Sequence, residues 1–211
     1  MFQSSAMAAE TPADPLVEER ALRIIETTIE LAEQGGFEAV RLRDVAAHAE
    51  VAMGTLYRRF HSKEDLLVAA LERETRAMAD RVFERPPKGD TPAERVVGFF
   101  MTATRGNLRR PNLTRAMFRA SAAGEPALAQ KVGIFHDLML RMVVGALRGA
   151  PIPTSGPAEI DDRERLLGEV LTQIWFAVMI SWSSGRETQA SINERMRASV
   201  ELVLDGANRN S

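Results

Sequence analysis

Two short helical segments separated by a tight turn constrain the fold more than any other feature of this 211-residue chain. The first segment covers residues 42–49, residues 50–52 form the turn, and the second segment covers residues 53–60. Ser62 then caps a longer helix, with Asp65 at the third helical position as a short version of a capping box. A pair of short helices, the second rich in polar and basic groups, is what a helix-turn-helix needs to place one helix in the DNA major groove.

The charge of this segment differs from that of the whole chain. The chain carries a net charge of −2, which gives no overall attraction to nucleic acid. Residues 41–63 hold five basic residues, Arg41, Arg43, Arg58, Arg59 and Lys63, against Asp44 and Glu50. A small basic face on a nearly neutral protein favours sequence-selective binding over general coating of DNA, although the same charges would also suit a solvated surface.

Side chains able to contact DNA gather in and around the second short helix. Gly54 allows the backbone to approach DNA closely, and Thr55 offers a hydroxyl to a base or phosphate and a methyl group to thymine. Leu56 and Phe60 have the i, i+4 spacing of core residues, whereas Arg58 either enters the groove or stays solvated. The predicted DNA-binding residues are Arg43, Met53, Gly54, Thr55, Tyr57, Arg58 and Lys63.

The rest of the chain has helical periodicity, which predicts an all-α fold of about nine helices. Leu22, Ile25 and Ile29 form an apolar stripe, and Gly35-Gly36 is a helix-stop signal. We expect a helix-turn-helix DNA-binding domain over residues 16–62 and a ligand-binding and dimerisation domain over residues 63–207. Residues 1–15 are expected to be a disordered tail or a remnant of cloning.

The C-terminal half contains many Met and aromatic residues at helical spacing, which suits either a plain core or an apolar cavity between helices. The predicted ligand-binding residues are Phe100, Met117, Phe118, Phe135, Met139, Met142, Trp175 and Met179. A polar cluster where two helices meet either binds an anionic head group or faces water; it comprises Arg105, Asn107, Arg109, Arg110 and Arg115. His136 is interpreted as a core histidine, with a hydrogen bond to a ligand as the alternative.

Residues 21–71 resemble the DNA-binding domain of the TetR family of bacterial transcriptional regulators. The matching motifs are Gly35-Gly36-Phe37-Glu38-Ala39-Val40, Asp44-Val45-Ala46, Val51-Ala52-Met53-Gly54-Thr55-Leu56-Tyr57 and Phe60-x-Ser62-Lys63-Glu64-x-Leu66. The chain is also similar to actinobacterial repressors of sterol catabolism, through residues 52–58, 110–114 and 175–182. This resemblance implies a repressor that a steroid or a fatty acyl-CoA thioester releases from a palindromic DNA operator.

The resemblance also implies a homodimer in which the last two helices of each subunit form a four-helix interface. The apolar stripes on these helices are Trp175, Val178, Met179 and Trp182, followed by Ile192, Met196, Val200 and Val203. A two-fold dimer would place its two recognition helices about 34 Å apart, the spacing of successive major grooves.

The sequence lacks the features of several other classes of protein. It has no cysteine, and it contains none of the common phosphate-loop, nucleophile-elbow or metalloprotease motifs. We therefore expect no enzyme, no cofactor, no metal and no membrane association, and a cytoplasmic location. The alternative is a helical carrier of lipids or small molecules that does not bind DNA. The operator, the ligand and the direction of regulation are not determined by the sequence.

Overall fold

The computed structural model describes residues 15–209, and within this range every regular element is a helix. The helices are α1 (Pro15–Ala39), α2 (Leu42–His48), α3 (Met53–Tyr57), α4 (Lys63–Glu84), α5 (Pro92–Leu108), α6 (Pro111–Ala122), η1 (Pro126–Leu128), α7 (Ala129–Arg148), α8 (Asp162–Ser183) and α9 (Gln189–Arg209). The prediction of an all-α fold with about nine helices is confirmed for the described residues. Apart from Pro15, the expected tail lies outside them.

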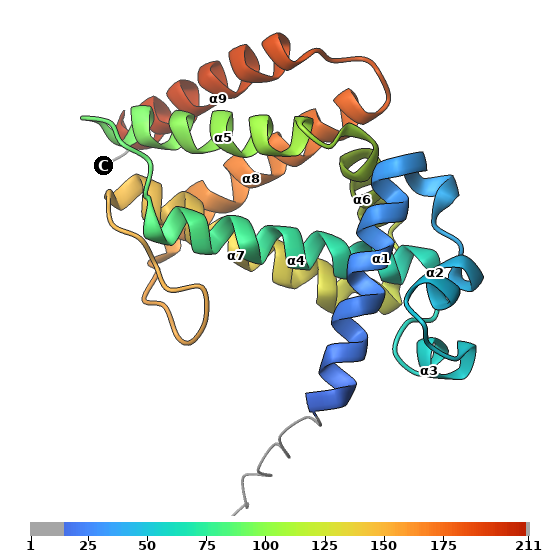
Figure 1. Ribbon diagram of the computed structural model, residues 1–211. Helices are drawn as coiled ribbons and strands as arrows, with labels where there is room; N and C mark the ends of the chain where they lie inside the picture. The colour runs from blue at the N-terminus through green and yellow to red at the C-terminus, as the bar shows by residue number, and fades with distance from the viewer. Residues whose placement is uncertain (1–14, 210–211) are drawn as a thin grey trace, which may run out of the picture.

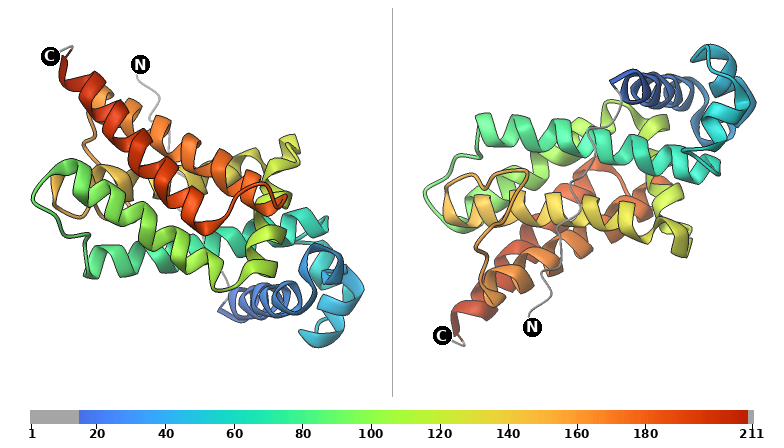
Figure 2. Two further views of the ribbon diagram at one scale, coloured as in Figure 1. Left: turned by 90° about the horizontal axis from the view of Figure 1, so that it is seen from above. Right: turned by 90° about the horizontal axis from the view of Figure 1, so that it is seen from below.

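The helices form a small group at one end of the molecule and a larger bundle beyond it (Figure 1). We call α1–α3 the head and α4–α9 the body. Figure 2 places the head at one end and the C-terminus at the opposite end in both views. Helix α4 packs against α1 on the head side and against α6 and α7 within the body, so it joins the two parts.

Local sequence signals explain where the long helices begin. The Ser62 hydroxyl accepts from the backbone N–H of Asp65 at 3.0 Å, and the Asp65 carboxylate accepts from the backbone N–H of His61 at 3.0 Å. The predicted cap by Ser62 is confirmed, whereas Asp65 accepts from the residue before the N-cap and not from Ser62 itself, as a capping box requires. Thr91 and Glu94 form a complete capping box at the start of α5. These caps satisfy backbone donors that have no partner within the helix.

The predicted apolar stripe of the first helix was wrong at one position. Leu22 is 45% exposed, whereas Ile24 is only 1% exposed. The face of α1 that packs against α4 and α6 contains Ala21, Ile24, Thr28 and Ala32. The predicted stop is present as a break in helical geometry at Gly35 and Gly36, where Gly36 has a φ of 68°.

The apolar stripes assigned to the dimer interface lie inside the chain. Trp175 and Met179 on α8 are 1% and 0% exposed, and Ile192 and Met196 on α9 are equally buried. Of the remaining members of these stripes, Val178, Trp182 and Val200 are also buried, and Val203 is half-buried against the same core. The prediction that these side chains face a second subunit is therefore wrong, because they pack within the helical bundle.

Helix α8 is both long and apolar. By length and composition alone it would be able to cross a membrane, a test that the core helix of a soluble protein also passes. In this structure it packs against α6, α7 and α9. Its composition is therefore accounted for, at least in part, by its place in the bundle.

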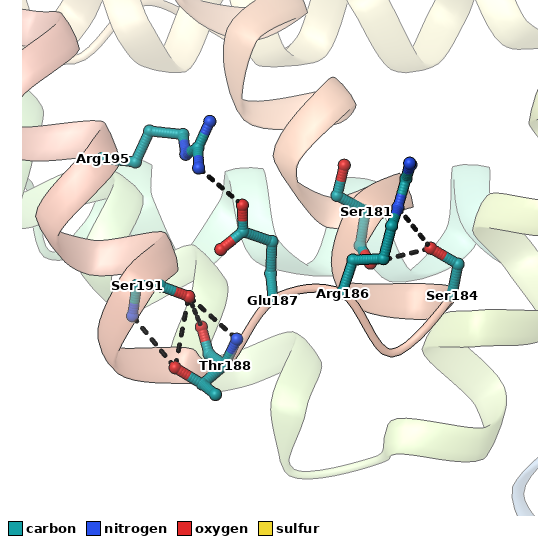
Figure 3. Close-up of polar contacts among 7 residues, drawn as sticks. All are labelled: Ser181, Ser184, Arg186, Glu187, Thr188, Ser191 and Arg195. Carbon is teal, nitrogen blue, oxygen red and sulfur yellow. Dashed lines mark hydrogen bonds and ion pairs between the residues drawn. The ribbon is translucent and has the colours of Figure 1, made fainter.

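A network of polar contacts fixes the corner between α8 and α9 (Figure 3). Thr188 and Ser191 cap each other, with the Thr188 backbone N–H donating to Ser191 Oγ at 2.8 Å and the Ser191 N–H donating to Thr188 Oγ1 at 3.2 Å. Glu187 forms an ion pair with Arg195 at 2.7 Å. These contacts provide partners for the backbone at the start of α9 and define where that helix begins.

Candidate DNA-binding head and ligand cavity

The turn between α2 and α3 orients the helix predicted to read DNA. Glu50 has a φ of 54°, and the backbone N–H of Val51 donates to the carbonyl of Ala46 at 3.0 Å. A left-handed conformation costs an L-residue about 1–2 kcal/mol, so surrounding contacts must hold the turn in place. Leu56 and Phe60 are 0% and 2% exposed and belong to the same buried cluster as Ala46 and Ala49, which flank the turn. The predicted core role of Leu56 and Phe60 is confirmed.

The outer surface of α3 is open to solvent, as DNA contact requires. Gly54, Tyr57 and Arg58 are exposed, and so is Arg43 at the start of α2. Met53 and Thr55 are half-buried. Arg58 Nη2 donates to Thr55 Oγ1 at 3.3 Å, so these two side chains lie on the same surface. Five of the seven predicted DNA-binding residues thus belong to α2 and α3, and Arg58 is the C-cap residue of α3.

Lys63 occupies a different environment from the other predicted DNA-binding residues. Its ammonium donates to the Glu38 carboxylate at 3.3 Å and lies 4.0 Å from the centre of the Phe37 ring. The hydrogen bond from Lys63 lowers the pKa of Glu38 below its ordinary value. Arg119 of α6 reaches the same carboxylate at 3.0 Å and stacks on the same ring. Lys63 therefore lies where the head meets the body.

A cavity of about 610 Å³ opens within the body. Its walls come from α4, α5 and α6, with single residues from α7 and α8. The apolar lining consists of Leu71, Met78, Val82, Phe99, Ala103, Leu113, Met117, Phe118, Phe135 and Trp175. A pocket of this size and character suits a drug-sized or lipid-like molecule.

Half of the predicted ligand-binding residues line this cavity. Met117, Phe118, Phe135 and Trp175 do so. The other four are buried elsewhere in the body and do not line it; they are Phe100, Met139, Met142 and Met179. The sequence shows which residues are apolar, but it does not show which of these residues line a cavity and which pack in the solid core.

The mouth of the cavity is rich in arginine. Arg105, Asn107, Arg109 and Arg110 of the predicted polar cluster all line it, together with Arg81 and Arg85 of α4. Arg115 does not, because it stacks 4.8 Å from the centre of the Trp182 ring. Only Glu74 adds a carboxylate to this lining. The cavity therefore combines an apolar interior with a strongly basic opening.

The α4 wall of the cavity was missed in the sequence. Leu71, Thr75, Met78 and Val82 continue one helical face beyond the part of α4 that covers the head, with Arg81 beside them. Their spacing of three and four residues was the available signal. That face is indistinguishable in sequence from an ordinary buried face.

The described residues contain no cluster of three metal ligands, and His136 lies beside aromatic rings. Among residues 15–209, no group of three or more His, Asp or Glu side chains is placed to hold a metal ion. His136 is half-buried beside the rings of Phe135 and Phe176, whose centres are 5.1 and 6.0 Å away. Burial lowers its pKa below the ordinary value. It does not line the cavity.

Comparison with known families identifies the class of protein. The model for bacterial regulatory proteins of the tetR family matches residues 24–70, and the model for tetracyclin repressor-like C-terminal domains matches residues 89–203. The chain belongs to the TetR family. It is a TetR-type transcriptional regulator with a helix-turn-helix head, and no comparison supports the carrier alternative.

Individual relatives place the chain more finely within the family. It is 35% identical over 192 residues to the HTH-type transcriptional repressor KstR of Rhodococcus jostii, covering 90% of this chain and 86% of that protein. The chain is thus of the KstR-like subgroup. A solved TetR regulator from a Rhodococcus species has a TM-score of 0.76 at 30% identity, covering 89% of this chain and 96% of that one.

A more distant structure shares the fold alone. Thermus thermophilus FadR, a TetR-family repressor solved in complex with lauroyl-CoA, has a TM-score of 0.66 at 19% identity. The match covers 88% of this chain and 94% of FadR.

Proposed function

We propose that this protein is a homodimeric repressor that releases a palindromic operator when an anionic, amphipathic ligand fills the body cavity. The observation that carries this proposal is the cavity of about 610 Å³, whose apolar interior opens through arginines. The DNA contacts are assigned to Arg43, Met53, Gly54, Thr55, Tyr57 and Arg58, with Lys63 at the edge of this surface. The proposed domains are a DNA-binding domain over residues 16–62 and a ligand-binding and dimerisation domain over residues 63–207.

The proposed ligand has an apolar body that matches the apolar interior of the cavity and an anionic group that matches its arginine-rich opening. A fatty acyl chain or a steroid nucleus fits the apolar interior, and the phosphates of coenzyme A fit arginine side chains, which bind phosphate bidentately. The complex of Thermus FadR with lauroyl-CoA shows this ligand chemistry in a protein of the same fold. We therefore propose a coenzyme A thioester of a fatty acid or a steroid acid as the inducer.

The dimer surface is assigned to the outward faces of α8 and α9. Leu166 and Leu202 are 61% and 71% exposed, and Ala177 and Ala198 are also exposed. In the most apolar 18-residue stretch of α8, only 39% of the stretch is buried within the chain. A partner subunit packed on this surface would cover the remaining apolar side chains. The proposed regulator works in the cytoplasm, where the chromosome lies, and does so without catalysis.

A DNA titration tests the proposal directly. The protein is titrated into a labelled fragment from beside its own gene and into an unrelated fragment, at two salt concentrations. Tighter binding to its own fragment that persists at the higher salt is expected of a sequence-reading repressor. Palmitoyl-CoA and cholyl-CoA are then added, with free coenzyme A as the control. Failure of both thioesters to bind or to release the DNA would contradict the ligand class.

The dimer is tested by replacing one exposed leucine. Leu202→Glu places a charge on the proposed interface and should convert the protein to a monomer in analytical ultracentrifugation, with loss of operator affinity. Phe83→Glu is the matched control, because Phe83 is exposed on α4 away from this surface. Equal sedimentation of the two variants would place the interface elsewhere.

A further inference from the structure

One arginine belongs both to the cavity and to the junction between head and body. Arg110 lines the cavity mouth immediately before α6. Its Nε and Nη2 donate to one oxygen of Glu33 on α1 at 3.0 and 2.8 Å. Its Nη1 lies 3.2 Å from the carboxylate of Glu74 on α4. The side chain of Asn112 supports the contact by donating to the backbone carbonyl of Glu33 at 3.1 Å.

One edge of the Arg110 guanidinium is already engaged by the protein. A guanidinium has five N–H groups; Nε and Nη2 each donate to Glu33, and Nη1 lies within ion-pair distance of Glu74. The hydrogen bonds to Glu33 raise the pKa of Arg110 further, so it stays charged at all ordinary pH values. A phosphate or carboxylate that binds the Nε and Nη2 edge of this side chain in a bidentate contact must displace Glu33.

The other arginines of the mouth lack this double role. Arg81, Arg85, Arg105 and Arg109 line the cavity and have no ion pair with the head among the described residues. Arg110 is therefore the one cavity-lining cation in the described part of the chain with a direct ionic contact to α1. An anion that binds Arg110 at the mouth therefore acts on a side chain that also contacts the DNA-binding head directly.

We propose that Arg110 is the positioning residue that senses the ligand, and that the ligand's anionic group competes with Glu33 for it. This rests on the proposed function, since it requires an anionic ligand in the cavity. Loss of the Arg110–Glu33 contact weakens the attachment of α1 to the start of α6, where the Asn112 hydrogen bond remains, and the head changes its orientation on the body. Ligand binding and operator release are thereby linked through one side chain, and the linkage is reciprocal.

The test compares two isosteric substitutions in α1. Glu33→Gln removes the charge that competes with the ligand. Glu26→Gln is the matched control, because Glu26 pairs with Arg73 of α4 at 2.5 Å, also joins head to body, and does not touch the cavity. The exposed fractions are similar, 48% for Glu33 and 52% for Glu26. Palmitoyl-CoA and cholyl-CoA are the probes, with affinities measured by calorimetry with and without operator DNA.

Glu33→Gln should bind the thioester about two- to five-fold more tightly than wild type, the factor set by a partly exposed ion pair. The loss of operator affinity caused by saturating thioester should shrink by a similar factor. Glu26→Gln should match wild type in both measurements. Arg110→Gln should bind the thioester more weakly, and its thermal unfolding should show that it is folded.

The outcomes separate this inference from the proposed function. If wild type binds a thioester and releases DNA while Glu33→Gln and Glu26→Gln behave alike, the competition is refuted and the repressor mechanism stands. If wild type binds neither thioester, both proposals fail, because Arg110 then has no anionic ligand to sense.

Discussion

Trp175 of α8 donates its indole N–H to the hydroxyl of Thr104 on α5 at 3.0 Å, inside the body. Both side chains are 1% exposed. The indole ring lines the cavity and packs against the rings of Phe100 and Phe118, whose centres are 6.1 and 5.7 Å away. This hydrogen bond therefore fixes the aromatic wall that a ligand would touch.

Thr104→Val should remove that hydrogen bond with little change in shape. The buried indole N–H is then left without an acceptor, which costs about 1–3 kcal/mol of unfolding free energy. Denaturant unfolding measures the loss. Thr102→Val on the exposed face of the same helix is the control, and it should change the free energy of unfolding by less than about 0.5 kcal/mol. Equal stability of the two variants would show that the indole finds another partner.

Tyr57→Ala should weaken operator binding and leave folding intact. Tyr57 is 49% exposed on α3, so its removal takes little packing from the core. Loss of one groove or phosphate contact corresponds to about 1–3 kcal/mol, or about five- to 150-fold in operator affinity. The measurements are a DNA titration and a thermal unfolding curve. Loss of thermal stability comparable to that of Leu56→Ala, a core change worth about 2–5 kcal/mol, would assign Tyr57 to the core instead.

Gly106→Phe should block the cavity without disturbing the helices. Gly106 lies in α5 at the cavity lining, and a Cβ atom added there meets nothing within 4 Å. Thioester affinity should fall at least tenfold while operator binding persists, so the variant should stay on DNA when ligand is added. Removing a helical glycine also avoids a cost of about 0.5–1 kcal/mol, so stability should not fall.

Gly133→Phe provides the comparison for Gly106→Phe. Gly133 lies in α7, has equal space for an added Cβ atom, and does not line the cavity. The Gly133→Phe variant should release DNA when the thioester is added, as wild type does. Unimpaired ligand response in Gly106→Phe would place the ligand outside this cavity.

His136 should make the protein less stable in mild acid. Burial holds its pKa in the folded state below 6.5, so the unfolded chain takes up a proton first as the pH falls. Stability is then lost as the pH falls below about 6.5 and is fully restored above it. His136→Gln should reduce the loss between pH 7.5 and pH 5 relative to wild type, measured by denaturant unfolding. An NMR titration giving a pKa above 6.5 would contradict this assignment.

The sequence predicted the head more closely than the body, for a physical reason. The Ser62–Asp65 cap, the break at Gly35-Gly36 and the buried Leu56 and Phe60 are all local features, set by residues a few positions apart. Helix boundaries in the body followed from the same kind of signal, such as Thr91 before α5.

The cavity and the dimer surface depend on packing between distant helices, which periodicity does not reveal. The stripe at Trp175 and Met179 shows that one face of α8 is apolar, but not whether a neighbouring helix or a second subunit covers it. For the same reason Phe100 and Met139 were predicted to line the cavity, although other helices enclose them completely.

The ion pairs at the junction have a consequence for domain exchange between relatives. Glu26, Glu33 and Glu38 supply the acidic partners from the head, and Arg73, Arg110 and Arg119 supply the basic partners from the body. The head is thus acidic toward its own body and basic toward the proposed DNA surface. A chimera that carries this head on another body will keep these three ion pairs only if the recipient has basic residues at the three corresponding positions.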